Sequence, residues 1–230
     1  MEHFFVPFTP QGTFQVEGET YRHLTRARRM AVGDTAVFCD GKGMDYLSKM
    51  IACDRDRATF EVVEQVPAVG ESPLSITLYQ CLPKGDKMEE VLHRCTPLGV
   101  TGFVPVISAR TIGGVPNENK QKRWEKIVAS AATQSGRSIL PTIAPPMKFA
   151  QAIAEMQQAD AAFICYENSR EPLPALPQKG HLAFLIGPEG GLTPQEAECL
   201  PTCTLGRRIL RTEDAAAFLL PILLDRTGNL

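Results

Sequence analysis

The pattern of apolar residues changes after Glu71-Ser72-Pro73, and this change constrains the fold more than any other feature of the sequence. Before it, short apolar runs are separated by turn residues, which is typical of a small antiparallel sheet or barrel. After it, apolar runs of strand length alternate with apolar residues at helical spacing, which is typical of a mostly parallel α/β sheet. The sequence therefore predicts a β domain over residues 1–72 and an α/β domain over residues 73–230.

The spacing of apolar residues also locates the elements within each half. In the N-terminal half we expect one helix, over Thr20–Met30 with Thr20 as its cap, among strands at 4–6, 35–39, 46–53 and 59–66. In the C-terminal half we expect strands at 74–80, 100–106, 139–143, 161–166, 183–186 and 202–205. The helices between them are expected at 88–98, 121–135, 149–158, from 194 onwards and at 212–226.

The overall charge and the apolar runs argue against several classes of protein. A net charge of −2 is unlike a surface coated in positive charge, so binding of nucleic acid would require a local basic patch. No apolar run approaches the ~18 residues of a membrane span, and the N-terminus lacks the pattern of a signal peptide. The histidines are scattered along the chain. We therefore expect a cytoplasmic protein that binds no membrane and no metal ion.

The segment AFLIGPEGGLTPQEA, residues 183–197, joins an expected strand to an expected helix through a glycine-rich loop. Thr193 is a good helix cap, Pro194 suits the first helical position, and Glu196 completes a capping box. Because glycine allows positive φ and lets a backbone lie against a ligand, the segment is either a binding loop or a tight connector. It matches neither GxxxxGK[ST] nor GxGxxG, so we expect no conventional nucleotide triphosphate site.

A second segment of the same kind, LGRRILRTEDAA at residues 205–216, again joins a strand, a glycine turn and a capped helix. Together with three further segments, in matching order and spacing, the two segments resemble the SPOUT methyltransferases. They resemble most closely the family of 16S ribosomal RNA uridine-N3 methyltransferases, known as ribosomal RNA small subunit methyltransferase E. The resemblance covers nearly the whole chain, and its further segments are HLTRARRMAVGD at 23–34, KGDKMEEVLHRCTPLGV at 84–100 and RWEKIVASAATQSGR at 123–137.

The resemblance implies a small PUA-like β-barrel that binds RNA, followed by a SPOUT-type α/β domain with a parallel sheet and a C-terminal trefoil knot. It also implies that S-adenosylmethionine binds in the knot loops, largely through backbone groups. Glycines there would let main-chain N–H and C=O groups reach the cofactor, while the side chains of Ile209 and Leu210 would line the adenine site. The matching cofactor-binding positions are Tyr166, Ile186, Gly187, Glu189, Gly190, Leu205, Gly206, Ile209, Leu210 and Thr212.

The resemblance further implies a homodimer that completes the site across two copies of the C-terminal domain. The apolar last helix, Ala215–Leu224, would supply contacts between the copies.

RNA binding is implied for two parts of the chain. Arginines in and beside the segment at 23–29 would hold phosphates through bidentate hydrogen bonds, although they could instead form the solvated face of a helix. The end of the helix at 121–135 would face an RNA-binding cleft, although its polar residues could instead only solvate the helix end. The positions are Arg22, Arg26, Arg28 and Arg29 in the first part and Gln134 and Arg137 in the second.

The implied reaction is transfer of the sulfonium methyl group to N3 of a uridine in 16S ribosomal RNA, within the small ribosomal subunit. Because N3–H of uracil is only weakly acidic, the enzyme must stabilise the anion or remove the proton as the methyl group arrives. We assign charge stabilisation to Arg211. Either Glu189 or Glu213 would accept the proton, and the sequence does not choose between them. The target base must be unpaired or flipped out.

Three positions depart from the pattern of the family, since Pro97, Thr133 and Asp214 stand where it usually has Glu, Glu and Thr. These departures keep open a second hypothesis, an RNA-binding ribosome assembly factor that has kept the fold and lost catalysis. A third hypothesis, a small-molecule methyltransferase, would leave the arginine-rich N-terminal segment without a purpose.

Overall fold

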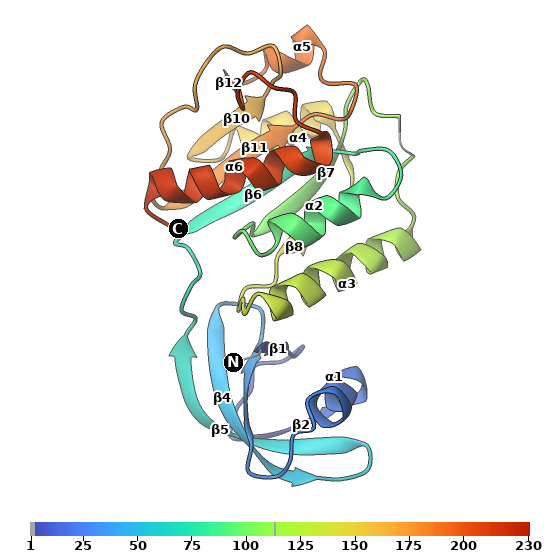
Figure 1. Ribbon diagram of the computed structural model, residues 1–230, viewed down its shortest axis with the longest axis vertical. Helices are drawn as coiled ribbons and strands as arrows, with labels where there is room; N and C mark the ends of the chain where they lie inside the picture. Colours follow the sequence, from blue (N-terminus) through green and yellow to red (C-terminus); the bar gives the residue numbers. More distant parts are fainter. Residues whose placement is uncertain (1–2, 113) are drawn as a thin grey trace. The chain divides into compact units, whose positions relative to one another are not determined.

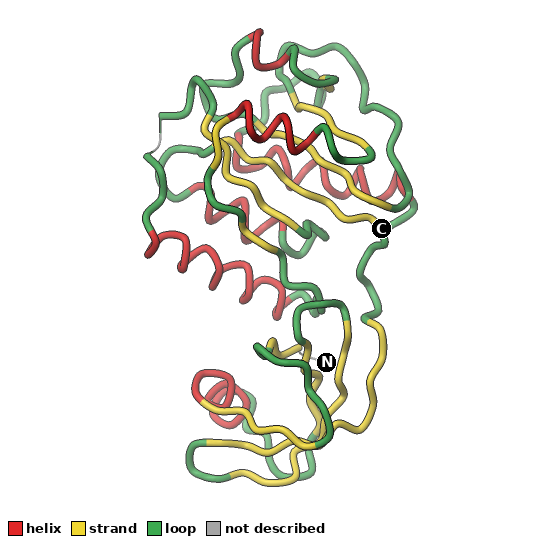
Figure 2. Tube along the Cα trace, turned by 180° about the vertical axis from the view of Figure 1, so that it is seen from behind, coloured by secondary structure: helices red, strands yellow, loops and turns green. Residues whose placement is uncertain are grey.

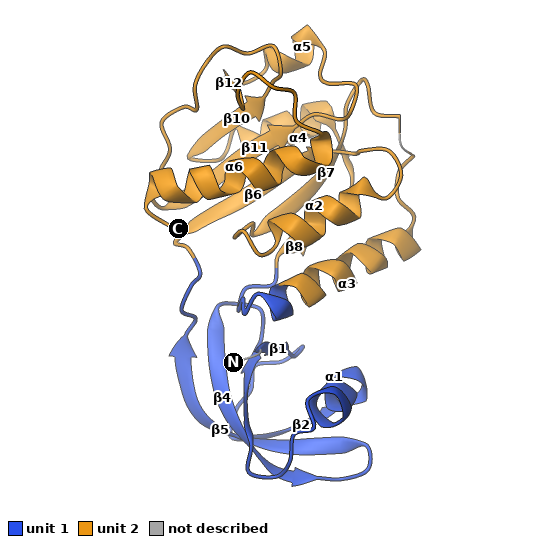
Figure 3. Cartoon of the chain, in the orientation of Figure 1, with its two compact units in different colours: residues 1–71, 132–140 blue, residues 72–131, 141–230 orange. Residues whose placement is uncertain are grey.

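The structure, a computed structural model, describes residues 3–112 and 114–230, and it divides the chain into two compact units (Figure 3). Unit 1 holds the residues up to Glu71 together with Ala132–Leu140, and unit 2 holds Ser72–Ala131 together with Pro141–Leu230. The segment 132–140, which the sequence pattern assigned to the C-terminal domain, is thus part of the first unit. The domain boundary after residue 72 stays a prediction.

Unit 1 is built on a five-stranded sheet in the order β1-β3-β4-β5-β2. Its first pair is parallel, whereas the other pairs are antiparallel. Along β2, Phe14 and Val16 are buried while their neighbours are exposed, so one face of the sheet covers the core. The rings of Phe14 and Phe60 both lie against Phe38 in that core. The strands are β1 (His3–Phe5), β2 (Thr13–Glu17), β3 (Thr35–Cys39), β4 (Met44–Cys53) and β5 (Arg57–Pro67).

The helix of unit 1 differs from the expected one. It begins as α1 (Gly18–Arg22) and continues as a π-helical turn, η1 (His23–Ala27), so Thr20 lies inside the helix and is not its cap. The main-chain N–H of Arg28 donates to the carbonyl of His23, which gives the wider π spacing. The fully buried Leu24 anchors this turn to the core.

Unit 2 is built on a parallel sheet in the order β12-β10-β11-β6-β7-β8, with β9 also pairing with β7 (Figure 1). The central strands are almost wholly buried, as expected for a sheet covered on both faces. The strands are β6 (Leu74–Cys81), β7 (Gly102–Ile107), β8 (Thr142–Ile143), β9 (Met147–Lys148), β10 (Ala161–Cys165), β11 (Gly180–Ile186) and β12 (Thr202–Cys203).

Helices cover both faces of this sheet (Figures 1 and 2). One apolar cluster joins α2, α3 and α6 to alternate residues of the strands, such as Leu78 and Phe184. A second cluster joins α4 to the strand residues that alternate with those of the first cluster, such as Tyr79 and Leu185. The helices are α2 (Lys87–Cys95), α3 (Glu118–Gln134), α4 (Phe149–Met156), α5 (Pro194–Ala197) and α6 (Thr212–Thr227).

This architecture confirms the predicted parallel α/β fold preceded by a small β domain, while the trefoil knot stays a prediction.

Helix α2 ends at Cys95, before the expected Leu98, because Pro97 has no N–H to continue the helix. The expected strand at 139–143 is reduced to β8, since Ile139 forms an isolated antiparallel bridge with Lys42 instead. Among the described residues, none of the helices has the length and apolar character needed to cross a membrane.

Candidate active site

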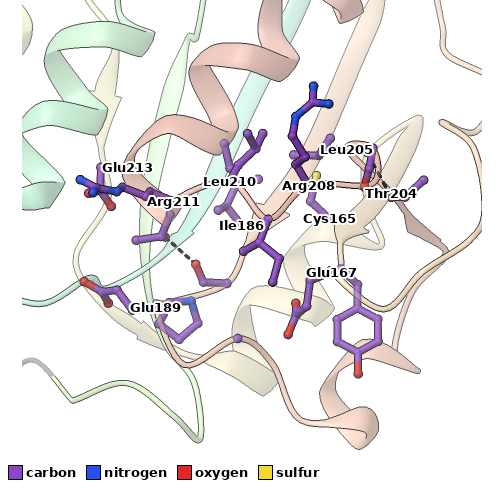
Figure 4. Close-up of a pocket in the computed structure, with 18 of the residues that line it drawn as sticks. Cys165, Glu167, Ile186, Glu189, Thr204, Leu205, Arg208, Leu210, Arg211 and Glu213 are labelled. Carbon is purple, nitrogen blue, oxygen red and sulfur yellow. Dashed lines mark hydrogen bonds between the residues drawn. The ribbon is translucent and has the colours of Figure 1, made fainter.

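A pocket of about 470 Å³ opens in unit 2, beyond the carboxyl ends of β10, β11 and β12 (Figure 4). In parallel α/β sheets, ligands bind in crevices at this edge. Every residue that the sequence suggested for cofactor binding or catalysis lies on the wall of this pocket. They are Tyr166, Ile186, Gly187, Glu189, Gly190, Leu205, Gly206, Ile209, Leu210, Arg211, Thr212 and Glu213.

The first glycine loop ends in the expected capping box. The hydroxyl of Thr193 accepts a hydrogen bond from the main-chain N–H of Glu196, whose carboxylate accepts one from the N–H of Thr193. The same carboxylate accepts a hydrogen bond of 2.8 Å from the N–H of Ala109. The loop is therefore fixed at its far end both within itself and by the segment that follows β7.

The loop glycines differ in what surrounds them. Gly206 has φ +111°, and a Cβ added there would meet no atom within 4 Å. A Cβ at Gly190 would instead lie 3.4 Å from Cβ of Arg110, whose guanidinium Nη1 donates to the carbonyl of Gly190 at 2.8 Å. The space beside Gly206 is thus empty, although its main-chain N–H and C=O are both hydrogen-bonded to the hydroxyl of Thr204. A Cβ at Gly190 would be in van der Waals contact with Arg110. Direct contact of Gly190 with the cofactor stays a prediction.

A buried polar chain ties the two loops together. Thr212 Oγ1 donates to the carbonyl of Gly187 at 2.6 Å, and it accepts a hydrogen bond of 3.0 Å from Nε2 of Gln80. Gln80 is fully buried at the end of β6. Sequence reasoning missed Gln80, and the only signal was one amide side chain near the end of an expected strand.

Two carboxylates and one ammonium group lie at one edge of the pocket. Nζ of Lys87 is 3.0 Å from Oε1 of Glu189 and 3.4 Å from Oε2 of Glu213. Burial raises the pKa of Glu189, but hydrogen bonds from Lys87 and main-chain N–H groups outweigh this effect and lower the pKa overall. Glu189 is therefore ionised at neutral pH. Sequence reasoning missed Lys87, although it lies in one of the segments that carried the family resemblance.

Arg211 precedes α6 with an extended backbone (φ −68°, ψ 149°), and its exposed side chain lines the pocket. Figure 4 shows Arg211, Glu213 and Glu189 on one side of the pocket, opposite Cys165 and Glu167. Among the described residues, none forms a hydrogen bond or ion pair with this guanidinium. Its donors are therefore available to a ligand.

Most of the residues suggested for RNA binding are exposed in unit 1. They comprise Arg22, Arg26, Arg28 and Arg29 in and after the helix, and Gln134 at the end of α3. Arg137 is different, because its side chain is only 7% exposed and its guanidinium pairs with Glu71. Arg137 is thus held by Glu71 within unit 1, and its contact with RNA stays a prediction.

The departure at Asp214 has a structural explanation. Its carboxylate pairs with Arg94 of α2, which also pairs with Glu90 at 2.8 Å. The acidic side chain therefore joins α6 to α2 and lies outside the wall of the pocket.

Within residues 3–112 and 114–230, the structure brings together no group of three or more His, Cys, Asp or Glu side chains able to hold a metal ion.

Comparison with known protein families supports the predicted fold and family. Residues 70–224 match the model of an RNA methyltransferase domain, and residues 16–63 match that of an RNA methyltransferase PUA domain. The chain thus falls in the class of SPOUT-type RNA methyltransferases with an N-terminal PUA domain.

Within this class, the chain belongs to the ribosomal RNA small subunit methyltransferase E family. It is 32% identical over 242 residues to the Bacillus subtilis member, covering 96% of this chain and 94% of that protein. The predicted family is therefore confirmed.

Two similar solved structures contain the cofactor. The Neisseria gonorrhoeae ribosomal RNA small subunit methyltransferase E, bound to S-adenosyl methionine, superimposes with a TM-score of 0.89 at 32% identity over 98% of this chain and 97% of that one. A putative methyltransferase from Legionella pneumophila, in complex with the same cofactor, gives a TM-score of 0.85 at 26% identity, covering 97% and 96% of the two chains.

Proposed function

We propose that this protein transfers a methyl group from S-adenosylmethionine to N3 of a uridine in 16S ribosomal RNA of the small ribosomal subunit. The observation that carries the proposal is the pocket between two glycine loops, with an available arginine and two carboxylates at one edge. The names of the relatives support the RNA substrate, and the cofactor in two similar structures supports S-adenosylmethionine.

The pocket fits the proposed cofactor. Its volume of about 470 Å³ is typical of small-molecule sites. Ile186, Leu205 and Leu210 offer apolar surface for an adenine, while the empty space beside Gly206 leaves room for a ligand to approach the backbone. S-adenosylmethionine would supply an electrophilic methyl group there. The carboxylates of Glu189 and Glu213 would favour its positive charge electrostatically.

Side chains at the edge of the pocket would stabilise the charge on the uracil and remove its proton. Arg211 would donate hydrogen bonds to a carbonyl oxygen beside N3, where negative charge grows as the proton leaves. Glu189 or Glu213 would accept that proton, since both line the pocket on the side of Arg211 (Figure 4). Separate Glu189→Gln and Glu213→Gln variants would identify the acceptor.

We propose that unit 1 binds RNA through its exposed arginines. Replacing Arg26 and Arg29 by alanine is expected to weaken RNA binding and to reduce its salt dependence, because each lost phosphate contact removes about one unit from the slope of log K against log salt. Fluorescence anisotropy at several salt concentrations would measure both quantities. An unchanged affinity and slope would mean that the arginines only solvate the helix.

We also propose that the protein is a homodimer through unit 2. Phe218 and Ile222 of α6 are exposed apolar side chains one helical turn apart, which is unusual for a surface that stays in water. Replacing both by aspartate is expected to convert a dimer to a monomer, as measured by light scattering. If the unaltered protein is monomeric at micromolar concentration and fully active, the dimer is wrong.

The main alternative is an assembly factor that binds RNA without catalysis, and it remains a separate candidate because of Pro97 and Thr133. Calorimetry with S-adenosylmethionine separates the two, since an inactive factor with a degraded pocket would bind none.

A protein that modifies ribosomal RNA would act in the cytoplasm, and we propose that location. The function itself is tested by mass spectrometry of 16S RNA from a deletion strain, in which 3-methyluridine should be lost.

A further inference from the structure

Lys87 connects the two loops that line the pocket. It is the first residue of α2, and its side chain reaches the pocket wall. Its two carboxylate partners come from separate segments, Glu189 from the glycine loop after β11 and Glu213 from the first turn of α6. The ammonium group of Lys87 therefore pairs with two carboxylates that come from different segments of the chain to the same edge of the pocket.

We propose that Lys87 is a positioning residue for methyl transfer, because its ammonium group holds Glu189 and Glu213 together at the edge of the pocket where Arg211 lies. The inference rests on the proposed function for its effect on rate. The ion pairs themselves can be tested without it.

Glu213 depends on Lys87 because it is almost fully buried. The residue is 5% exposed, and among the described residues none forms a hydrogen bond with its Oε2 atom. Nζ of Lys87 lies 3.4 Å from this atom. A buried carboxylate without a counter-charge is unfavourable and tends to become protonated. Removing the ammonium group would therefore leave this buried carboxylate without that cation and favour movement of its side chain.

Glu189 is held by the same cation and by the start of the α2 segment. Its Oε1 accepts hydrogen bonds from Nζ of Lys87 and from the main-chain N–H of Lys84, both at 3.0 Å. Without Lys87, the two carboxylates would face each other with no cation between them. Their mutual repulsion would favour either protonation of one carboxylate or rotation of Glu189 away from the pocket.

Lys87 itself is not suited to accept the proton. The hydrogen bond with Glu189, and the further contact with Glu213, raise the pKa of its ammonium group above the ordinary value. It stays charged at neutral pH and holds the carboxylates while one of them takes the proton.

The test replaces Lys87 by methionine, which keeps the length of the side chain and removes its charge. The single-turnover rate of methyl transfer at saturating S-adenosylmethionine should fall about tenfold or more, since hydrogen bonds to charged groups are among the stronger ones. Independently of activity, ¹³C NMR of the carboxyl groups should show a raised pKa for Glu189. The Glu189→Gln variant would assign that signal by its disappearance.

The charged groups that face Glu189 are few enough for this titration to be interpreted. Lys87 faces it from α2, Glu213 and Arg211 lie at the start of α6, and Arg110 contacts the neighbouring Gly190 from the loop after β7. Only Lys87 changes in the variant, so a shift in the pKa of Glu189 reports its loss.

Lys120→Met is the matched control. The Lys120 side chain is 33% exposed, against 35% for Lys87, and its Nζ pairs with Asp86 next to the start of α2. It lies outside the pocket wall, so its removal should change neither the rate nor the titration of Glu189. Lys87→Arg should recover part of the rate, because a guanidinium can also bridge two carboxylates.

A double-mutant cycle completes the test. In the Glu189→Gln background, Lys87→Met should lower the single-turnover rate much less than it does in the unaltered protein. The reason is that one partner of Lys87 has already lost its charge in that background. Additive effects would overturn the proposal, as would an unchanged rate together with an unchanged titration of Glu189. A loss confined to cofactor affinity would also overturn it. If the unaltered protein makes no 3-methyluridine, the proposed function fails, and the NMR titration still decides whether Lys87 holds Glu189.

Discussion

Replacing Arg211 by alanine is expected to lower the single-turnover rate of methyl transfer about a hundredfold. The reason is that a preorganised donor aimed at growing negative charge contributes on the order of 3 kcal/mol to stabilising a transition state. In the structure, the Arg211 guanidinium lines the pocket beside Glu213 and is available to a ligand. The affinity for S-adenosylmethionine should change little, as calorimetry would show.

Two further measurements separate this role from others. Raising the pH should partly restore the rate of Arg211→Ala, because N3 of uracil then ionises without help. Arg211→Lys should recover only part of the rate, since a point charge does not reproduce the planar fork of a guanidinium. If the alanine variant keeps its rate and loses cofactor affinity instead, Arg211 belongs to the cofactor site and the catalytic assignment is wrong.

Replacing Arg137 by alanine is expected to lower the free energy of unfolding of unit 1 by about 3–5 kcal/mol, as breaking buried ion pairs does. Nη2 of Arg137 lies 2.8 Å from Oε2 of Glu71, with side-chain exposures of 7% and 12%. Oε1 of Glu71 also accepts hydrogen bonds from the main-chain N–H groups of Ser138 and Ile139. Urea unfolding, with hydrogen exchange of the β4 and β5 amides, would measure the loss.

Arg57 provides a control for that prediction within unit 1. Its Nε lies 3.5 Å from Oδ1 of Asp56, and the two side chains are 44% and 78% exposed. Exposed pairs contribute only about 0–1 kcal/mol, so Arg57→Ala should have a small effect. If both variants lose less than about 1 kcal/mol, the pair between Arg137 and Glu71 does not hold the segment 132–140 to unit 1.

The same pair predicts how stability depends on pH. Burial raises the pKa of Glu71, but the hydrogen bonds and charge of Arg137 and the two main-chain donors outweigh it and lower the pKa. The folded value thus lies below the unfolded one. The stabilisation is present above the ordinary glutamate pKa, and it is lost as the pH falls through the lowered value. Glu71→Gln should flatten this acid dependence.

Much of unit 2 could be predicted from the sequence because its signals are local. Buried parallel strands produce continuous apolar runs, as in Leu182–Ile186, and glycine loops followed by helix caps mark the pocket edge. The short strand Thr13–Glu17 was missed because it has only two apolar residues, although their alternation is that of a half-buried strand.

The remaining features depend on contacts between distant parts of the chain. Nothing near Arg137 in the sequence indicates that its partner is Glu71, so this buried ion pair was missed. The roles of Gln80 and Lys87 likewise arise only when α6 and the first glycine loop lie beside them. The sequence could identify the loops of the pocket, whereas the polar contacts that hold those loops needed the structure.

The central claim, methylation of N3, is tested most directly with purified protein, S-adenosylmethionine and small ribosomal subunits lacking the modification. After digestion of the RNA to nucleosides, liquid chromatography with mass spectrometry would identify the product. We expect 3-methyluridine, approaching one per subunit, to form with the unaltered protein and to form about a hundredfold more slowly with Arg211→Ala. A methyl group on another atom, or no methylated nucleoside despite cofactor binding, would contradict the account.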